Sequence, residues 1–80
     1  MDKEIETLDA TGLRCPLPVL RARKALKGMS DGGLLEVLAT DTAAPPDFEA
    51  FCRETGHTLV TIEQTDEIYT IRLRKAVSAR

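Results

Sequence analysis

The distribution of apolar residues along the chain predicts four β-strands. Residues 4–9 form a short first strand, and residues 34–40 are an almost continuous apolar run, which is typical of an interior strand. Residues 57–64 and 68–75 are two further strand-like segments. Because only the polar residues 65–67 separate them, we expect these two strands to form an antiparallel hairpin.

Two other segments carry apolar residues at the spacing of a helix. Residues 16–27 place several of them on one side, which predicts a stripe buried against the sheet. The stripe consists of Val19, Ala22, Ala25, Leu26 and Met29. A second helix is expected to start near Pro46 and to end before Gly56. Its shared face consists of Phe48, Phe51, Cys52 and Thr55.

The resulting order, β-α-β-α-β-β, predicts one four-stranded mixed sheet with both helices on one face, a two-layer α/β (α+β) sandwich. The 80 residues are enough for a single domain. We expect its core to span residues 4–75 and residues 76–80 to form a frayed tail. The pattern requires no more than a monomer.

Composition and charge restrict the cellular compartment and the kinds of partner that we expect. The net charge of −2 and the pI of about 5.3 argue against nucleic acid as a direct ligand. No apolar run approaches the ~20 residues of a membrane span, and the N-terminus has no signal-peptide character. We therefore expect a cytoplasmic protein, not bound to membranes, whose thiols stay reduced. Charge is uneven, because residues 16–27 are basic while acidic residues outnumber basic ones in residues 31–80. This asymmetry favours an acidic protein partner for the end that carries Cys15.

Residues 12–18, with the sequence GLRCPLP, hold the most informative candidate group. A residue before proline is pushed towards extended geometry, which is also the geometry of a helix N-cap, and proline is favoured at the first helical position. This predicts Cys15 as the N-cap, Pro16 as the first helical residue and Pro18 as the third. The thiol would then lie at the positive end of the helix dipole.

Such a position is expected to lower the pKa of the Cys15 thiol below the ~8.5 of free cysteine. Arg14 is adjacent, the helix adds further cations, and residues 11–29 contain no acidic residue. The backbone N–H groups of Leu17 and Val19 would be free to donate to a thiolate. The alternative is that Cys15 is only a capping residue, although serine, threonine, asparagine and aspartate cap better.

The helical projection places Leu17 and Leu20 outside the buried stripe, beside Arg21 and Lys24. Two exposed leucines next to a reactive thiol predict a docking patch for a partner, although single exposed leucines are common on protein surfaces.

The remaining candidates carry weaker signals. Cys52 lies on the apolar face of the second helix, where a cysteine usually acts as a small hydrophobe. His57 is either a pH-sensitive base or a residue that opens a strand. Cys15, Cys52 and His57 lack the spacing of a metal site, so we expect neither a metal nor a cofactor. Pro18 occupies the place of the second cysteine of a Cys-x-x-Cys motif, which excludes a thioredoxin-like dithiol cycle.

Residues 8–18, LDATGLRCPLP, closely resemble the signature of the TusA (SirA-like) sulfur-carrier family, in which Cys-Pro-x-Pro marks the sulfur-bearing cysteine. Residues 39–41, 47–48 and 51–57 resemble the second motif region of that family, and the similarity runs from about residue 6 to residue 75. The chain departs from the family at Thr42, where proline is common, and has prolines at 45 and 46 instead.

The resemblance implies a two-layer α/β sandwich and a sulfurtransferase-type activity. Cys15 would accept sulfane sulfur as a persulfide from a donor protein, such as a cysteine desulfurase or rhodanese, with Arg14, Pro16 and Pro18 as supporting residues. An acceptor protein, such as a DsrE-type or tRNA-thiolation enzyme, would then take the sulfur for tRNA thiolation, cofactor supply or sulfur oxidation.

Two alternatives to a sulfur carrier remain at the level of sequence. The chain is either a non-catalytic regulatory or binding domain in which Cys15 is only a cap, or a thiol redox sensor. In the sensor, Cys15 would be oxidised to a sulfenic acid and then pair with Cys52.

Overall fold

The computed structural model describes residues 4–77, and its elements follow the predicted order. The strands are β1 (Ile5–Ala10), β2 (Leu34–Ala39), β3 (Thr58–Thr65) and β4 (Ile68–Arg74). The helices are α1 (Leu17–Lys27) and α2 (Ala44–Thr55). The observed bounds differ from the predicted ones by one or two residues, because patterning does not define where an element frays.

The sheet has the strand order β1-β2-β4-β3, which the sequence left undetermined. β1 and β2 are parallel and are connected through α1, whereas β4 is antiparallel to both β2 and β3. β3 and β4 form the predicted hairpin, and Asp66 turns the chain with a φ of 57°. β2 is an interior strand, as its continuous apolar run predicted.

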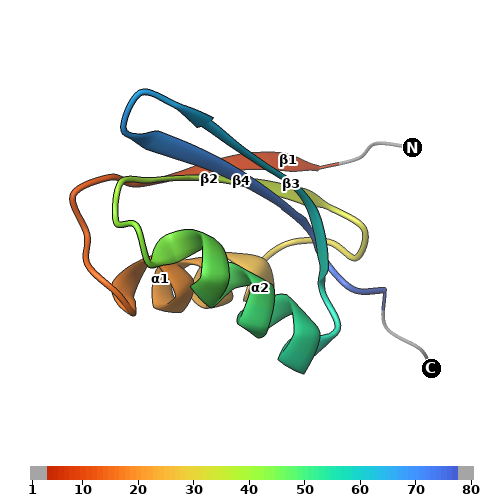
Figure 1. The fold of residues 1–80 in the computed structure, drawn as a ribbon. Coiled ribbons are helices and arrows are strands. Elements are labelled where there is room, and N and C mark those ends of the chain that lie inside the picture. The colour runs from red at the N-terminus through yellow and green to blue at the C-terminus, as the bar shows by residue number, and fades with distance from the viewer. Residues whose placement is uncertain (1–3, 78–80) are drawn as a thin grey trace.

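Both helices pack on one face of the sheet, which confirms the two-layer sandwich (Figure 1). The core lies between the two layers. Its largest fully buried apolar side chains come from both helices and from the two interior strands β2 and β4. They are Phe48, Leu26, Leu35, Ile71, Leu73 and Val37.

The helix stripes largely match the predicted ones. Ala22, Leu26 and Met29 are buried, while Val19 and Ala25 are partly buried and pack against the core. The face of α2 is confirmed except at Thr55, which is exposed at the last turn and donates its hydroxyl to the carbonyl of Phe51. Pro18 is also buried, which the sequence did not predict, because a proline in the first turn of a helix is explained by backbone geometry alone.

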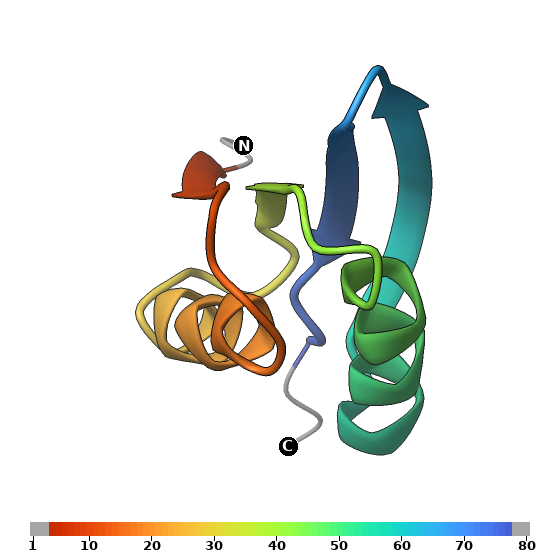
Figure 2. The ribbon, with the colours of Figure 1, turned by 60° about the vertical axis from the view of Figure 1, so that its left-hand side comes forward.

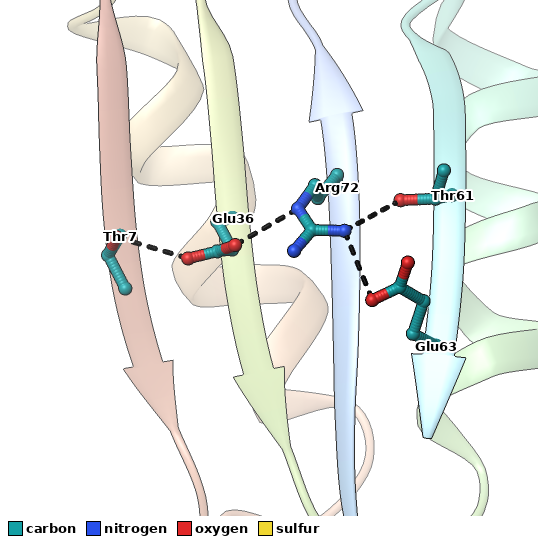
Figure 3. A network of polar contacts seen from close by, with 5 residues as sticks. All are labelled: Thr7, Glu36, Thr61, Glu63 and Arg72. Carbon is teal, nitrogen blue, oxygen red and sulfur yellow. Dashed lines mark hydrogen bonds and ion pairs between the residues drawn. The ribbon is translucent and has the colours of Figure 1, made fainter. Parts of the chain in front are cut away.

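Within residues 4–77, no helix covers the opposite face of the sheet, and a row of polar side chains crosses this face (Figure 3). Arg72 on β4 makes an ion pair with Glu36 on β2 at 3.0 Å and a second with Glu63 on β3 at 3.4 Å. Thr7 donates its hydroxyl to Glu36, and Thr61 accepts a hydrogen bond from Arg72. Four strands are thereby joined through side chains as well as through the backbone.

The end of the described chain is tied to the body of the protein. The backbone N–H of Ala76 donates to His57 Nδ1 at 2.9 Å, so the expected frayed tail does not begin at residue 76. Residues 78–80 of that predicted tail lie outside the described residues.

Candidate functional site around Cys15

The parallel pairing of β1 and β2 brings two loops together at one edge of the sheet. Because parallel strands end at the same edge, the loop after β1, which carries Cys15, lies beside the loop after β2. The backbone N–H of Gly12 donates to Thr40 Oγ1 at 2.9 Å across this junction. The candidate site is therefore assembled from segments almost thirty positions apart in the sequence.

Asp41 anchors the backbone at Cys15. Its Oδ2 accepts the Cys15 N–H at 2.6 Å, and its Oδ1 accepts the Ala43 N–H at 3.0 Å just before α2. These two hydrogen bonds, followed by the charge of Arg14, hold the pKa of the Asp41 carboxyl below its usual value. One carboxylate thus fixes the reactive loop and the approach to α2 together.

The start of α1 differs by one residue from the prediction. Pro16 is the N-cap and Leu17 the first helical residue, so Cys15 precedes the cap and Pro18 is the second helical residue. The Leu17 N–H donates to the carbonyl of Arg14 at 2.8 Å, which closes a turn around a cis Cys15–Pro16 peptide. The Leu17 N–H is therefore not free to bind sulfur, contrary to expectation.

Both prolines nevertheless suit this helix start. Neither needs an N–H group in the first turn, where intrahelical partners are missing. Pro18 is buried and attaches the first turn of α1 to the core, while Cys15 remains exposed. The thiol is thus presented to solvent from a firmly anchored backbone.

The expected lowering of the thiol pKa is wrong. The pKa of Cys15 is raised, first because its thiol donates a hydrogen bond to the Asp47 carboxylate, then through desolvation and the negative charges of Asp47 and Asp41. A nearby carboxylate disfavours the thiolate, which would be a second negative charge.

Two of the cations that were expected to lower this pKa lie at the far end of α1, whereas Arg23 lines the same hollow as Cys15. Lys24 and Lys27 lie in the last turn of α1, where they complement the negative end of the dipole. At about 1.5 Å of rise per residue, Lys27 is some 15 Å from the helix start, which exceeds the Debye length of ~8 Å at physiological salt. The charge of Arg14 acts on Asp41.

Sequence reasoning missed Asp47 because it belongs to the first turn of α2, more than thirty positions after Cys15. An acidic residue in a first turn is ordinarily explained by the helix dipole alone. The available signal was its place in the second motif region, beside Phe48.

The predicted docking residues are exposed. Leu17 and Leu20 retain 41% and 50% of their accessible surface, and Arg21 and Lys24 are also exposed. Because they are spaced by three or four residues along α1, all four lie on one face of the helix, where Arg21 and Lys24 also line a hollow with Leu8 of β1. That this face docks a partner stays a prediction.

Cys52 and His57 have surroundings that suit a structural role. Cys52 is buried in α2, and burial raises the pKa of its thiol. The His57 ring lies 5.7 Å from that of Phe51 and accepts the N–H of Ala76. Among residues 4–77 there is no group of three or more His, Cys, Asp or Glu placed to hold a metal ion.

These features define a class of small α/β protein that presents one anchored, exposed thiol just before a helix. A family model described as sulfurtransferase TusA matches residues 6–75, and the chain belongs to this family.

Individual relatives agree with this assignment. A putative sulfur carrier protein of Neisseria meningitidis serogroup A is 61% identical over 66 residues, covering 82% of this chain and 89% of the relative. The sulfur carrier protein TusA of Allochromatium vinosum is 42% identical over 71 residues, covering 89% and 93%. The crystal structure of a SirA-like protein from Desulfitobacterium hafniense matches with a TM-score of 0.77 at 26% identity, covering 90% and 99%.

No helix within residues 4–77 has the length and apolar character needed to cross a membrane.

Proposed function

We propose that this protein is a sulfur carrier that holds sulfane sulfur as a persulfide on Cys15 and relays it between two proteins. The family assignment supports a carrier role. The observation that supports Cys15 as the carrying residue is its exposure on a backbone anchored by Asp41 and by the buried Pro18.

The proposed sulfur transfer needs no outside oxidant. The Cys15 thiolate attacks the outer sulfur of the donor's persulfide, the sulfur–sulfur bond of the donor breaks, and the donor cysteine leaves as a thiolate. The thiol proton of Cys15 moves through Asp47 or water and ends on that departing thiolate. In the second step an acceptor thiolate attacks the outer sulfur on Cys15 in the same manner.

The raised pKa of Cys15 suits a carrier that waits for a partner. A thiol that stays protonated in the free protein resists oxidation, because oxidation follows thiolate character. A partner that places a cation beside Asp47 would remove the main cause of the raised pKa and so release the thiolate. Attack would then occur only in the docked complex.

The same observations disfavour a redox sensor. Sensor cysteines have a low pKa and an accessible resolving cysteine. Here the pKa of Cys15 is raised, and Cys52 retains only 6% of its accessible surface. The finer partner classes, a cysteine desulfurase or rhodanese as donor and a DsrE-type or tRNA-thiolation protein as acceptor, are part of the proposal, as is a cytoplasmic location.

Intact-mass spectrometry after incubation with a cysteine desulfurase and cysteine tests the carrier role. We expect one added sulfur that dithiothreitol removes, absent in Cys15→Ser and retained in Cys52→Ser. Added sulfur that persists in Cys15→Ser would reject Cys15 as the carrying residue.

A further inference from the structure

A groove between α1 and α2 runs away from Cys15 and has two hollows. The near hollow, of about 210 Å³, is lined by Cys15, Asp47 and Glu54 among others. The far hollow, of about 350 Å³, lies towards the segment that follows β4. Arg23 and Phe51 line both hollows, so the two are neighbours along the groove. Figure 2 shows the two helices side by side, with the chain after β4 descending between them.

The two hollows differ in charge. Acidic Asp47 and Glu54 line the near hollow beside Arg23, its one cation, whereas the residues that line the far hollow include three cations and no carboxylate. These cations are Arg23, Lys27 and Lys75. The protein as a whole has a net charge of −2, so this concentration of positive charge is local.

The far hollow is also preformed and apolar at its base. Its lining includes the buried side chains of Leu26 and Phe51, and the Arg23 guanidinium lies 5.5 Å from the Phe51 ring centroid. The Lys75 backbone N–H donates to the carbonyl of Gly33 at 2.8 Å and its Nζ donates to the carbonyl of Met29 at 2.5 Å, which holds the residue in place. Arg23 and Lys27 are therefore the main cations offered to a ligand. A carboxylate on a short aliphatic stem therefore matches both the charge and the base of this hollow.

We propose that the far hollow binds an acidic side chain of the partner protein, on the same extended segment that brings the partner's cysteine to Cys15. This inference rests on the proposed carrier function. Lys27 lines the far hollow and follows Leu17, the first residue of α1, by ten residues, which span about 15 Å of helix. An extended chain covers that distance in about five residues, which sets the separation of the acidic residue from the cysteine.

A nucleic acid fits this groove less well than a peptide. Its repeated phosphates would have to pass the carboxylates of Asp47 and Glu54 in the near hollow, whereas a peptide can carry a single negative charge at the far end. The charge pattern of the groove therefore selects a segment with one acidic residue at a defined distance.

A thiol-exchange experiment on the full chain tests the proposal without relying on sulfur transfer. Cys15 is first converted to its mixed disulfide with thionitrobenzoate, and a short peptide thiol then attacks the Cys15 sulfur and releases coloured thionitrobenzoate. The probes are peptides in which glutamate and cysteine are separated by four glycines, in both orders, and the same peptides with glutamine in place of glutamate. Mass spectrometry verifies a single adduct.

We expect one order of the glutamate peptide to react about threefold to fivefold faster than its glutamine counterpart at low salt, in line with a partly exposed ion pair. The ratio of the glutamate-peptide rate to the glutamine-peptide rate should fall to one or below in Lys27→Glu. It should persist in Arg53→Glu, the matched control, which reverses a charge in the last turn of α2 outside the groove. Lys27→Gln should give an intermediate ratio.

Three results would overturn the proposal. One is a ratio of one for both orders in the unsubstituted protein, and another is equal loss of the ratio in Arg53→Glu. The third is abolition of the ratio by a micromolar single-stranded RNA oligomer, which would assign the hollow to nucleic acid. Loading of Cys15 by a persulfide donor is measured separately. If Cys15 is loaded with sulfur but the two peptides react at equal rates, only the binding role of the far hollow is rejected. If Cys15 is not loaded but the glutamate peptide still reacts faster, only the carrier function is rejected.

Discussion

At the scale of single residues, Cys15 lies between two carboxylates with different tasks. Asp41 accepts the backbone N–H of Cys15 and so holds the residue in place, whereas the Asp47 carboxylate is the main cause of the raised pKa of the thiol. Both negative charges oppose formation of the thiolate. The thiolate is the nucleophile in sulfur chemistry, so the free protein keeps its thiol in the less reactive form.

Replacing Asp47 tests this balance directly. Asp47→Asn should lower the pKa of the Cys15 thiol, because the amide removes the negative charge and accepts a weaker hydrogen bond. The rate of iodoacetamide alkylation should rise severalfold near neutral pH, since one pKa unit changes the thiolate fraction by about tenfold. The measurement is alkylation rate against pH, followed by mass spectrometry.

The matched control for that substitution is Glu49→Gln, because Glu49 is exposed on the same helix and does not line the groove. In Glu49→Gln, the pH midpoint of Cys15 alkylation should equal that of the unsubstituted protein. A midpoint in Asp47→Asn that stays in place or moves to higher pH would contradict the role given to the carboxylate.

At the scale of elements, the two helices depend on how each one starts and ends. The first turn of α1 contains Pro18, and the first turn of α2 contains Pro45 and Pro46, where a missing N–H costs little. α2 ends at Gly56, whose φ of 90° directs the chain into His57 and β3.

Substitution of the two helix-end glycines separates backbone geometry from side-chain contacts. Gly56→Ala should destabilise the protein by about 1–2 kcal/mol, because a residue with a Cβ is disfavoured in the left-handed region. Gly28 caps the end of α1 with a φ of −92°, which any residue can adopt. A Cβ added there would meet only the Ala25 carbonyl oxygen, at 3.8 Å, so Gly28→Ala should change the free energy of unfolding by at most about 0.5 kcal/mol. Urea unfolding measures both. Equal destabilisation by the two variants would show that φ at Gly56 is not the cause.

At the scale of the whole molecule, His57 connects the end of α2, the start of β3 and the chain after β4. Its Nδ1 accepts the Ala76 N–H, which requires that this nitrogen carry no proton. Burial, and then the charge of Lys75, hold the pKa of His57 below its usual 6.5. The folded protein therefore favours the neutral imidazole.

This gives stability a defined pH dependence. Because the unfolded chain binds the proton more readily, the contribution of His57 is fully present above about pH 6.5 and is lost as the pH falls from there towards the folded pKa. The urea midpoint should decrease between about pH 7.5 and pH 5.5. In His57→Phe, which keeps an aromatic ring beside Phe51, the decrease should be smaller; parallel curves for the two proteins would argue against His57 as the titrating group.

The sequence could predict those features that depend on residues close together in the chain. Element order, the buried stripes, the hairpin and the exposed Leu17 and Leu20 follow from periodicity and turn chemistry, which act over a few residues. The position of Cys15 was wrong by one residue, because the pair Cys15–Pro16 fits either side of a helix boundary and the turn closed by the Arg14 carbonyl decides between them.

By itself, the sequence determined the architecture, the family signature and the single exposed thiol beside a helix start. Tertiary structure decided the strand order, the direction of the Cys15 pKa shift and the charge pattern of the groove. The physical reason is that an electrostatic interaction depends on distance in space. Asp41 and Asp47 reach Cys15 only because the parallel pairing of β1 and β2 brings the starts of both helices to one edge of the sheet.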